Sequence, residues 1–137
     1  MRRLLIADAS EIYTDALEEV FRNEFELHIC HDGESALEEL LSFRPEVLIL
    51  NLMLPYKDAL TVLQESAHKP QVVLALASYV PPYVYQTMDA VGIDYILIAP
   101  TINTIRVRLM DLIAAATEKS ADPATQTAVH LHALNFP

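Results

Sequence analysis

The chain is poor in glycine, cysteine and basic residues, and each shortage excludes a class of function. Only two glycines occur, Gly33 and Gly92, so there is no glycine-rich phosphate loop and no G-x-G-x-x-G motif. The single cysteine, Cys30, excludes an internal disulfide and fits a reducing cytoplasm. Nine Lys and Arg against 19 Asp and Glu give a net charge of −10, which argues against binding to nucleic acid or to an acidic membrane surface.

Long hydrophobic runs are also missing. No segment approaches the roughly 20 apolar residues of a membrane span. The opening segment MRRLLIADAS has a short apolar run broken by Asp8, which does not fit a signal peptide. We therefore expect a cytoplasmic protein. Since 53% of the 137 residues are hydrophobic, the chain has enough apolar side chains for the core of one domain.

Five short apolar runs predict five buried strands. They are residues 4–7, 25–30, 47–52, 72–77 and 95–99. Strict alternation with helical patterns predicts an α/β fold with a doubly wound, five-stranded parallel sheet of the flavodoxin or CheY-like (βα)5 type, in the order 2-1-3-4-5. In that order the site lies at the C-terminal ends of strands 1 and 3, which carry Asp8 and Asn51.

The segments between the runs carry apolar stripes at helical spacing. The stripe residues are Ile12, Tyr13, Ala16, Leu17, Val20 and Phe21; Ala36, Leu37, Leu40 and Leu41; Leu60, Leu63 and Ala67; and Val84, Met88 and Val91. A fifth helix is expected over residues 102–118, capped by Thr101 or Asn103, while Asp32 and Gly92 fit an N-cap and a C-cap. After Lys119 the chain becomes small and polar, so we expect a domain over 1–119, then a linker and the start of another domain over 120–137.

Three segments of residues 2–119 resemble a response-regulator receiver (CheY-like) domain of two-component signalling. They are LLIADAS, RPEVLILNLMLPYKDAL and GIDYILIAP. The resemblance implies a site in which an acidic pair holds Mg²⁺ and an aspartate after strand 3 accepts a phosphoryl group. It also implies a hydroxyl and a lysine that bind the phosphoryl oxygens.

Position by position, this site is depleted. Asp8 stands first in the acidic pair, but Ala9 stands second, and Asn51 occupies the phosphoacceptor position. The other matched positions hold Ala77 for the hydroxyl, with Ser78 next to it, Ala99 for the lysine, and Ile96 for the switch aromatic, with Tyr95 before it. An amide cannot become an acyl phosphate, so we predict a pseudo-receiver that is not an enzyme and needs no cofactor. Mg²⁺ binding should be weak or absent, with Asp8 as the only carboxylate candidate.

Other segments resemble sporulation-initiation response regulators, namely IADAS, RPEVLILNLMLPYKDALTVL and TQTAVHLHALNFP. This resemblance implies a transcription regulator whose DNA contacts lie in a domain outside the chain. Its expected partners are proteins, including its own output domain. A homodimer is expected through the fourth helix, fifth strand and fifth helix, with interface candidates Tyr79, Tyr83, Tyr85, Arg106 and Arg108.

Several alternatives stay open. The domain could be phosphorylated at a non-standard residue such as Asp58, with Ser78 replacing the missing hydroxyl. It could instead be a flavodoxin-like ligand binder that uses the same cleft. Asp8 could simply cap the first helix, and Asn51 could either lock one signalling state or only relieve carboxylate repulsion. His28 and His31 flank Cys30, but alternation along a strand favours core packing over a zinc site.

Overall fold

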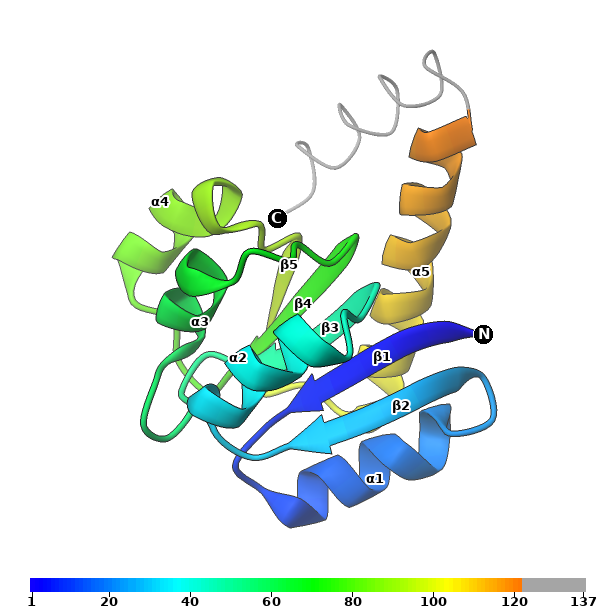
Figure 1. Ribbon diagram of the computed structural model, residues 1–137, viewed down its shortest axis with the longest axis horizontal. Helices are drawn as coiled ribbons and strands as arrows, with labels where there is room; N and C mark the ends of the chain where they lie inside the picture. The colour runs from blue at the N-terminus through cyan, green and yellow to red at the C-terminus, as the bar shows by residue number, and fades with distance from the viewer. Residues whose placement is uncertain (122–137) are drawn as a thin grey trace.

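Five parallel strands form one sheet in the order β2-β1-β3-β4-β5, which confirms the predicted topology. The computed structural model describes residues 1–121 (Figure 1). The strands are β1 (Arg2–Ala7), β2 (Phe25–Cys30), β3 (Val47–Asn51), β4 (Val72–Ala77) and β5 (Tyr95–Ile98). The helices are α1 (Glu11–Phe21), α2 (Gly33–Ser42), α3 (Ala59–Glu65), α4 (Pro82–Val91) and α5 (Ile102–Ala121).

Each face of the sheet is covered by its own helices and has its own core. Helices α1 and α5 cover one face, where Leu17, Phe21 and Ile105 pack against Leu4 and Ile6. Helices α2, α3 and α4 cover the other face, where Leu5 and Ala7 point. The alternation of β1 side chains between the two cores follows from the period of two along a strand. Burial on both faces explains why the strands read as continuous apolar runs.

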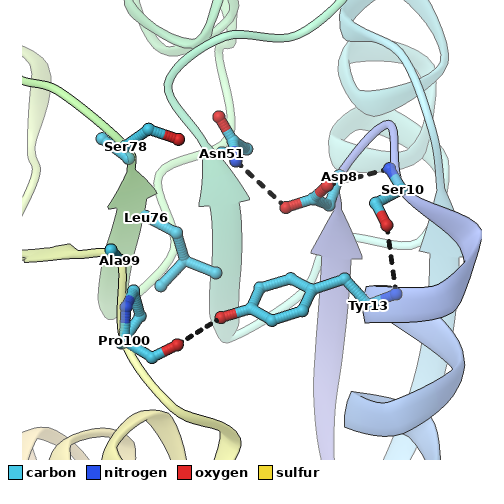
Figure 2. Close-up of a pocket in the computed structure, with 9 residues that line it drawn as sticks. Asp8, Ser10, Tyr13, Asn51, Leu76, Ser78, Ala99 and Pro100 are labelled. Carbon is cyan, nitrogen blue, oxygen red and sulfur yellow. Dashed lines mark hydrogen bonds between the residues drawn. The ribbon is translucent and has the colours of Figure 1, made fainter.

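The register of the sheet brings the C-terminal ends of four strands to one edge. Ala7 pairs with Leu50, Asn51 with Leu76, and Ala77 with Ile98. Asp8, Ser78 and Ala99 directly follow these strands and therefore meet Asn51 at the same edge (Figure 2). This edge is the place where doubly wound sheets bind ligands.

Local capping explains where the helices begin and end. The side chain of Asp32 accepts from the Ser35 backbone N–H at 2.7 Å, as expected for an N-cap. Thr101 accepts from the Thr104 N–H at 3.1 Å, so Thr101 caps α5. Gly92 ends α4 with φ +83°, a left-handed conformation in which glycine has no Cβ penalty. These three observations confirm the caps expected from the sequence.

The helical stripes are wrong in detail at three positions. Ile12 is 85% exposed, and the core position of the first turn of α1 is taken by Thr14, whose hydroxyl donates to the Glu11 carbonyl. Leu41 is 69% exposed because α2 buries a narrower face, and Ala67 lies beyond the end of α3. Helix α5 continues to Ala121 and so includes the first two residues of the linker predicted over 120–137. The rest of the predicted linker and further domain, residues 122–137, lies outside the described part.

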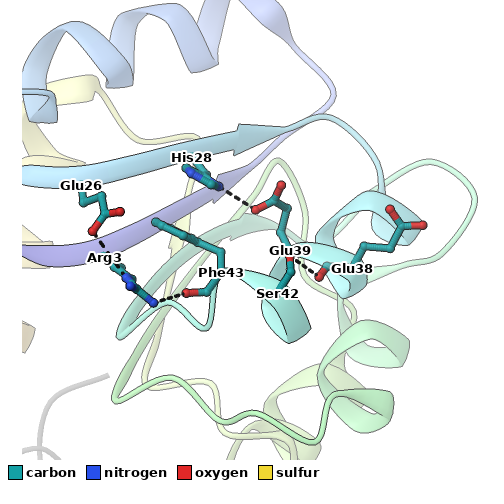
Figure 3. A network of polar contacts seen from close by, with 7 residues as sticks. All are labelled: Arg3, Glu26, His28, Glu38, Glu39, Ser42 and Phe43. Atoms are coloured by element: carbon teal, nitrogen blue, oxygen red, sulfur yellow. Dashed lines mark hydrogen bonds and ion pairs between the residues drawn. The ribbon is translucent and has the colours of Figure 1, made fainter.

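A polar cluster connects β1, β2 and α2 on the sheet face opposite α1 (Figure 3). His28 stacks on the Phe43 ring at 3.7 Å between centroids, and its Nδ1 lies 2.7 Å from the Glu39 carboxylate. Arg3 pairs with Glu26 at 3.4 Å and donates to the Phe43 carbonyl at 2.9 Å. These contacts fix the C-terminal end of α2 against the edge strand.

The Cys30 thiol should be unreactive in the folded protein. Its side chain is 6% exposed, and burial, followed by the charges of Glu39 and Asp32, raises the thiol pKa to about 12. Because the thiolate is the reactive form, a disulfide reagent at pH 8 should react at least about a hundredfold more slowly with the native protein than with the urea-unfolded chain. Equal rates would contradict this burial. This placement confirms core packing for Cys30.

Candidate functional site

A hollow of about 370 Å³ opens at the C-terminal edge of the sheet. Figure 2 shows Asp8 and Asn51 on one side of it and Ser78 and Ala99 on the other. The lining residues are Asp8, Ser10, Tyr13, Asn51, Leu76, Ala77, Ser78, Ala99 and Pro100. The structure therefore brings together four of the positions that the sequence singled out as a depleted site, namely Asp8, Asn51, Ala77 and Ala99.

Asp8 and Asn51 are joined by a direct hydrogen bond. Asn51 Nδ2 donates to Asp8 Oδ2 at 3.1 Å, and Asn51 Oδ1 accepts from the Met53 backbone N–H at 2.9 Å. The reverse orientation of the amide would place its oxygen against the carboxylate and its NH₂ against an N–H group. The neighbours therefore fix the orientation of the Asn51 amide, and both of its ends are satisfied.

Asp8 also closes the turn between β1 and α1. Its side chain is 5% exposed, and its Oδ1 accepts from the Ser10 backbone N–H at 2.9 Å. Ser10 itself caps α1, since its hydroxyl accepts from the Tyr13 N–H at 3.2 Å. Asp8 is therefore not the N-cap of α1 itself, and it supports the start of the helix from two residues before the N-cap.

Tyr13 spans the lower side of the hollow and ties α1 to the segment after β5 (Figure 2). Its hydroxyl donates to the Pro100 carbonyl at 2.9 Å. Burial, followed by the negative charge of Asp8, raises the pKa of the Tyr13 phenol above its ordinary value. The phenol therefore stays neutral at physiological pH and remains a hydrogen-bond donor.

Small side chains leave the opposite side of the hollow open. Ala77 is buried at the end of β4, whereas Ala99 is exposed, with φ +46°, in the turn before Pro100. Ser78 is exposed and lines the hollow, while Ala9 is exposed and does not line it. A methyl group at positions 77 and 99 offers neither a hydroxyl nor a cation to a phosphoryl group.

The residues present do not fit a Mg²⁺ site. Mg²⁺ requires an octahedral set of hard oxygen ligands, usually including one or two free carboxylates. Here Asp8 is the single carboxylate that lines the hollow, and the Asn51 oxygen accepts from the Met53 N–H. Among the described residues there is no cluster of three or more His, Cys, Asp or Glu with metal-binding geometry. His28 and His31 contact Glu39 and Thr14 respectively.

The substitute and switch residues proposed from the sequence lie in ordinary structural roles. Asp58 caps α3, because its side chain accepts from the Thr61 N–H at 2.9 Å, and it does not line the hollow. Ile96 is half-buried against the core under α2, α3 and α4. Tyr95 points to the other face, where the Arg108 guanidinium lies 4.1 Å from its ring centroid.

The interface candidates are mostly exposed. Tyr79, Tyr83 and Tyr85 are 70%, 60% and 52% exposed, on the loop before α4 and on α4 itself. Arg106 is exposed and bonded to Asn103 at 3.1 Å, whereas Arg108 is half-buried against Tyr95. The structure therefore offers the three tyrosines and Arg106 to a partner, but Arg108 only in part.

Sequence reasoning did not assign Ser10 and Tyr13 to the site, and it expected Pro100 only as the residue after Ala99. Ser10 could have been found, because a serine that follows a strand and directly precedes an apolar stripe is an N-cap signal. The bond between Tyr13 and Pro100 joins residues 87 positions apart, and no local pattern predicts it.

The comparisons with curated proteins match only parts of longer chains. The chain is 32% identical over 136 residues to protein-glutamate methylesterase/protein-glutamine glutaminase 2 of Rhodopseudomonas palustris, covering 95% of this chain and 37% of that protein. It is 29% identical over 129 residues to protein-glutamate methylesterase/protein-glutamine glutaminase 3 of Rhodospirillum rubrum, covering 86% and 35%. The chain thus spans about a third of the length of these relatives. No protein-family model matches the sequence.

Solved structures share the whole architecture. Chemotaxis response regulator CheY4 of Vibrio cholerae aligns with TM-score 0.68 and 21% identity, over 82% of this chain and 98% of that one. The signal receiver domain of an HD domain-containing protein from Pseudomonas fluorescens aligns with TM-score 0.71 and 18% identity, over 85% and 97%. No helix in residues 1–121 is long and apolar enough to cross a membrane. The chain has the fold of a response-regulator receiver domain.

Proposed function

We propose that this chain is a pseudo-receiver domain of a response regulator, which signals through protein contacts instead of through phosphorylation of an aspartate. The observation that carries the proposal is the hydrogen bond from Asn51 Nδ2 to Asp8 Oδ2 at 3.1 Å. Asn51 stands at the position that the resemblance to receiver domains assigns to the phosphoacceptor, and its amide is a neutral donor to the neighbouring carboxylate. Asn51 and Asp8 therefore have hydrogen-bond partners without a phosphoryl group.

The rest of the hollow supports the same conclusion. Phosphoryl transfer is catalysed by positioning and by cations that offset negative charge. Ala77 and Ala99 provide neither, and no ion pair among the described residues involves Asp8. A phosphate-bearing flavodoxin-like ligand is disfavoured as well, because the Asp8 carboxylate would repel it and the Ser10 N–H is already used. We infer that the domain is not an enzyme and that it works in the cytoplasm.

The proposed output is a further domain of a longer protein. The match to the Rhodopseudomonas palustris relative covers 95% of the chain, which is more than residues 1–121 alone. The sequence similarity therefore continues beyond residue 121. This favours an output like that of the methylesterase relatives. The tail resemblance to sporulation-initiation regulators favours a DNA-binding output instead, and we keep this as the second candidate.

A homodimer through α4, β5 and α5 is part of the proposal. Three large apolar side chains of β5 and α5 are exposed, Ile98 (53%), Val107 (46%) and Met110 (37%), as are Tyr83 (60%) and Tyr85 (52%) of α4. Isolated exposed apolar residues are common, but several large aliphatic and aromatic side chains exposed on the same three elements favour a contact surface. A strictly monomeric protein at high concentration would contradict this part of the proposal.

The test is an amide NMR titration with Mg²⁺ followed by beryllofluoride, a phosphoryl mimic. The proposal expects no saturable shifts of the Asp8, Asn51 and Ala77 amides at millimolar concentrations, because one carboxylate is too few for Mg²⁺ and Ala77 and Ala99 offer no hydroxyl or cation to a phosphoryl mimic. A receiver domain that retains its aspartate serves as the positive control. Saturable shifts at these three amides would overturn the proposal.

A further inference from the structure

Asp8 is a buried charge without a cation. Its side chain is 5% exposed, and its two hydrogen bonds come from neutral donors, the Asn51 amide and the Ser10 backbone N–H. Within the described residues, no Lys, Arg or His forms an ion pair with it. Buried carboxylates are normally paired with positive groups. The hollow at the sheet edge therefore carries a negative charge that the protein itself does not neutralise.

The carboxylate still has acceptor capacity on the side of the hollow. An ionised carboxylate has about four lone-pair sites, and the two described hydrogen bonds use one on each oxygen. The volume of about 370 Å³ lies at the low end of the range for ligand pockets, roughly 300–1,000 Å³. Figure 2 shows Asp8 and Ala99 on opposite sides of the hollow, with the Leu76 side chain drawn between them. Because Asp8 lines this hollow, a small group inside it can reach the carboxylate.

The other lining groups suit a cation. The Tyr13 ring lines the hollow, and an aromatic face attracts positive charge. The exposed Ser78 hydroxyl at the opposite side can accept a hydrogen bond. The net charge of −10 raises the local concentration of cations and repels anions. The size of the hollow, its lining groups and the net charge of the chain thus all favour a small cationic group.

We propose that this pocket binds a positively charged group of the kind that ends a lysine or arginine side chain, with Asp8 as its counter-ion. A guanidinium group would place two N–H donors on the two carboxylate oxygens, and an ammonium group would place one between them. The proposal rests on the proposed function, since it takes the pocket to be free of phosphoryl chemistry. It implies that the pseudo-receiver binds partners that present a lysine or arginine side chain.

Exposed apolar side chains near the pocket favour a cation carried by a partner protein. Met53, whose N–H binds Asn51, is 76% exposed, and Tyr79, next to Ser78, is 70% exposed. A peptide that places one basic side chain in the pocket could cover both. A free small amine would use only the pocket, so the two sources of the same cationic group can be separated by experiment.

The experiment is an amide NMR titration of the complete chain with methylguanidinium and with n-butylammonium. We expect saturable shifts at Asp8, Asn51, Ser78 and Ala99, and none with neutral butyramide. Asp8→Asn should weaken the affinity for both cations at least about tenfold, because the counter-ion is lost. The matched control is Asp15→Asn, which removes one charge from an exposed position on α1 outside the pocket and should leave the affinity unchanged. Absence of shifts, or equal shifts in Asp8→Asn, would overturn the proposal.

A second variant keeps the proposal testable if Asp8→Asn unfolds. In Ala99→Lys, the new side chain enters the hollow from the position facing Asp8 and should supply the missing cation from within the chain, so methylguanidinium should lose at least about tenfold in affinity. Undiminished binding would contradict the pocket as the site. A peptide distinguishes the two sources of the cation. If acetylated and amidated Leu-Arg-Leu binds at least about tenfold more tightly than methylguanidinium, the cation belongs to a protein partner, and equal affinity indicates a small cation. Failure of the proposed function would appear separately, as shifts with Mg²⁺ and beryllofluoride.

Discussion

Gly33→Ala is expected to lower the free energy of unfolding by about 3 kcal/mol, at the upper end of the cost of overpacking. A Cβ at Gly33 would lie 1.7 Å from the backbone carbonyl oxygen of Lys57, a distance that no rotamer change relieves. The Gly33 N–H also donates to the Pro55 carbonyl at 3.0 Å. The start of α2 is therefore fitted to the loop between β3 and α3, and a methyl group must push the two apart.

The same loop connects this glycine to the site. It contains Tyr56, with φ +68°, and Met53, whose N–H holds Asn51 Oδ1. Displacement of the loop should therefore shift the Asn51 and Asp8 amides in an NMR spectrum as well as lower stability. Urea unfolding measures the free energy.

Gly92→Ala is the matched control for Gly33→Ala. Gly92 has φ +83° and no atom within 4 Å of its ideal Cβ, so the substitution costs only left-handed strain, about 1 kcal/mol. If Gly33→Ala were no more destabilising than Gly92→Ala, the contact between α2 and the Lys57 carbonyl would not be as tight as described.

Asn51→Asp is expected to cost about 2–3 kcal/mol at neutral pH in the absence of divalent cations, because it replaces a charge-assisted hydrogen bond by two facing carboxylates. The Asn51 nitrogen lies 3.1 Å from Asp8 Oδ2, and Asp8 is buried. In the variant the repulsion raises the folded-state pKa of one carboxyl above its unfolded value of about 3.9. The folded variant then binds more protons than the unfolded chain. The loss in free energy of unfolding is therefore complete above the raised pKa, and it shrinks as the pH falls toward about 4.

Mg²⁺ should partly restore the stability of Asn51→Asp, because two carboxylates at one strand edge begin to form an oxygen site. The wild-type melting temperature should not respond to Mg²⁺. Asn103→Asp is the matched control, since it makes the same chemical change at an exposed residue beside Arg106 and should have almost no effect. A variant as stable as wild type at neutral pH would show that the Asn51 to Asp8 hydrogen bond does not stabilise the fold.

Local patterns predict most of this fold because its strands are buried on both faces. The runs at 25–30 and 72–77 coincide with β2 and β4, and the caps Asp32 and Gly92 are where the sequence puts them. Alternation of strands and helices then leaves few topologies, and the order 2-1-3-4-5 follows. Boundaries are less certain, as α5 shows by extending to Ala121.

What the sequence could not predict depends on contacts between distant residues. The hydropathy stripe predicts that Ile12 is buried, but the buried residue in this turn of α1 is Thr14. The Thr14 hydroxyl is hydrogen-bonded to the Glu11 carbonyl and to His31. The orientation of the Asn51 amide depends on the hydrogen bond from the Met53 N–H. The lower side of the hollow depends on the hydrogen bond from the Tyr13 hydroxyl to the Pro100 carbonyl. The sequence predicted which groups are missing from the site, but not how the remaining ones pair.

The most direct test of the central claim is the intact mass of the protein after incubation with acetyl phosphate and Mg²⁺, beside a receiver domain that retains its aspartate. We predict an unchanged mass for this chain and a gain of one phosphoryl group for the control domain. A stoichiometric gain on this chain, mapped to Asp8, Asp58 or Ser78, would contradict the claim and would show that the fold still accepts a phosphoryl group at a non-standard residue.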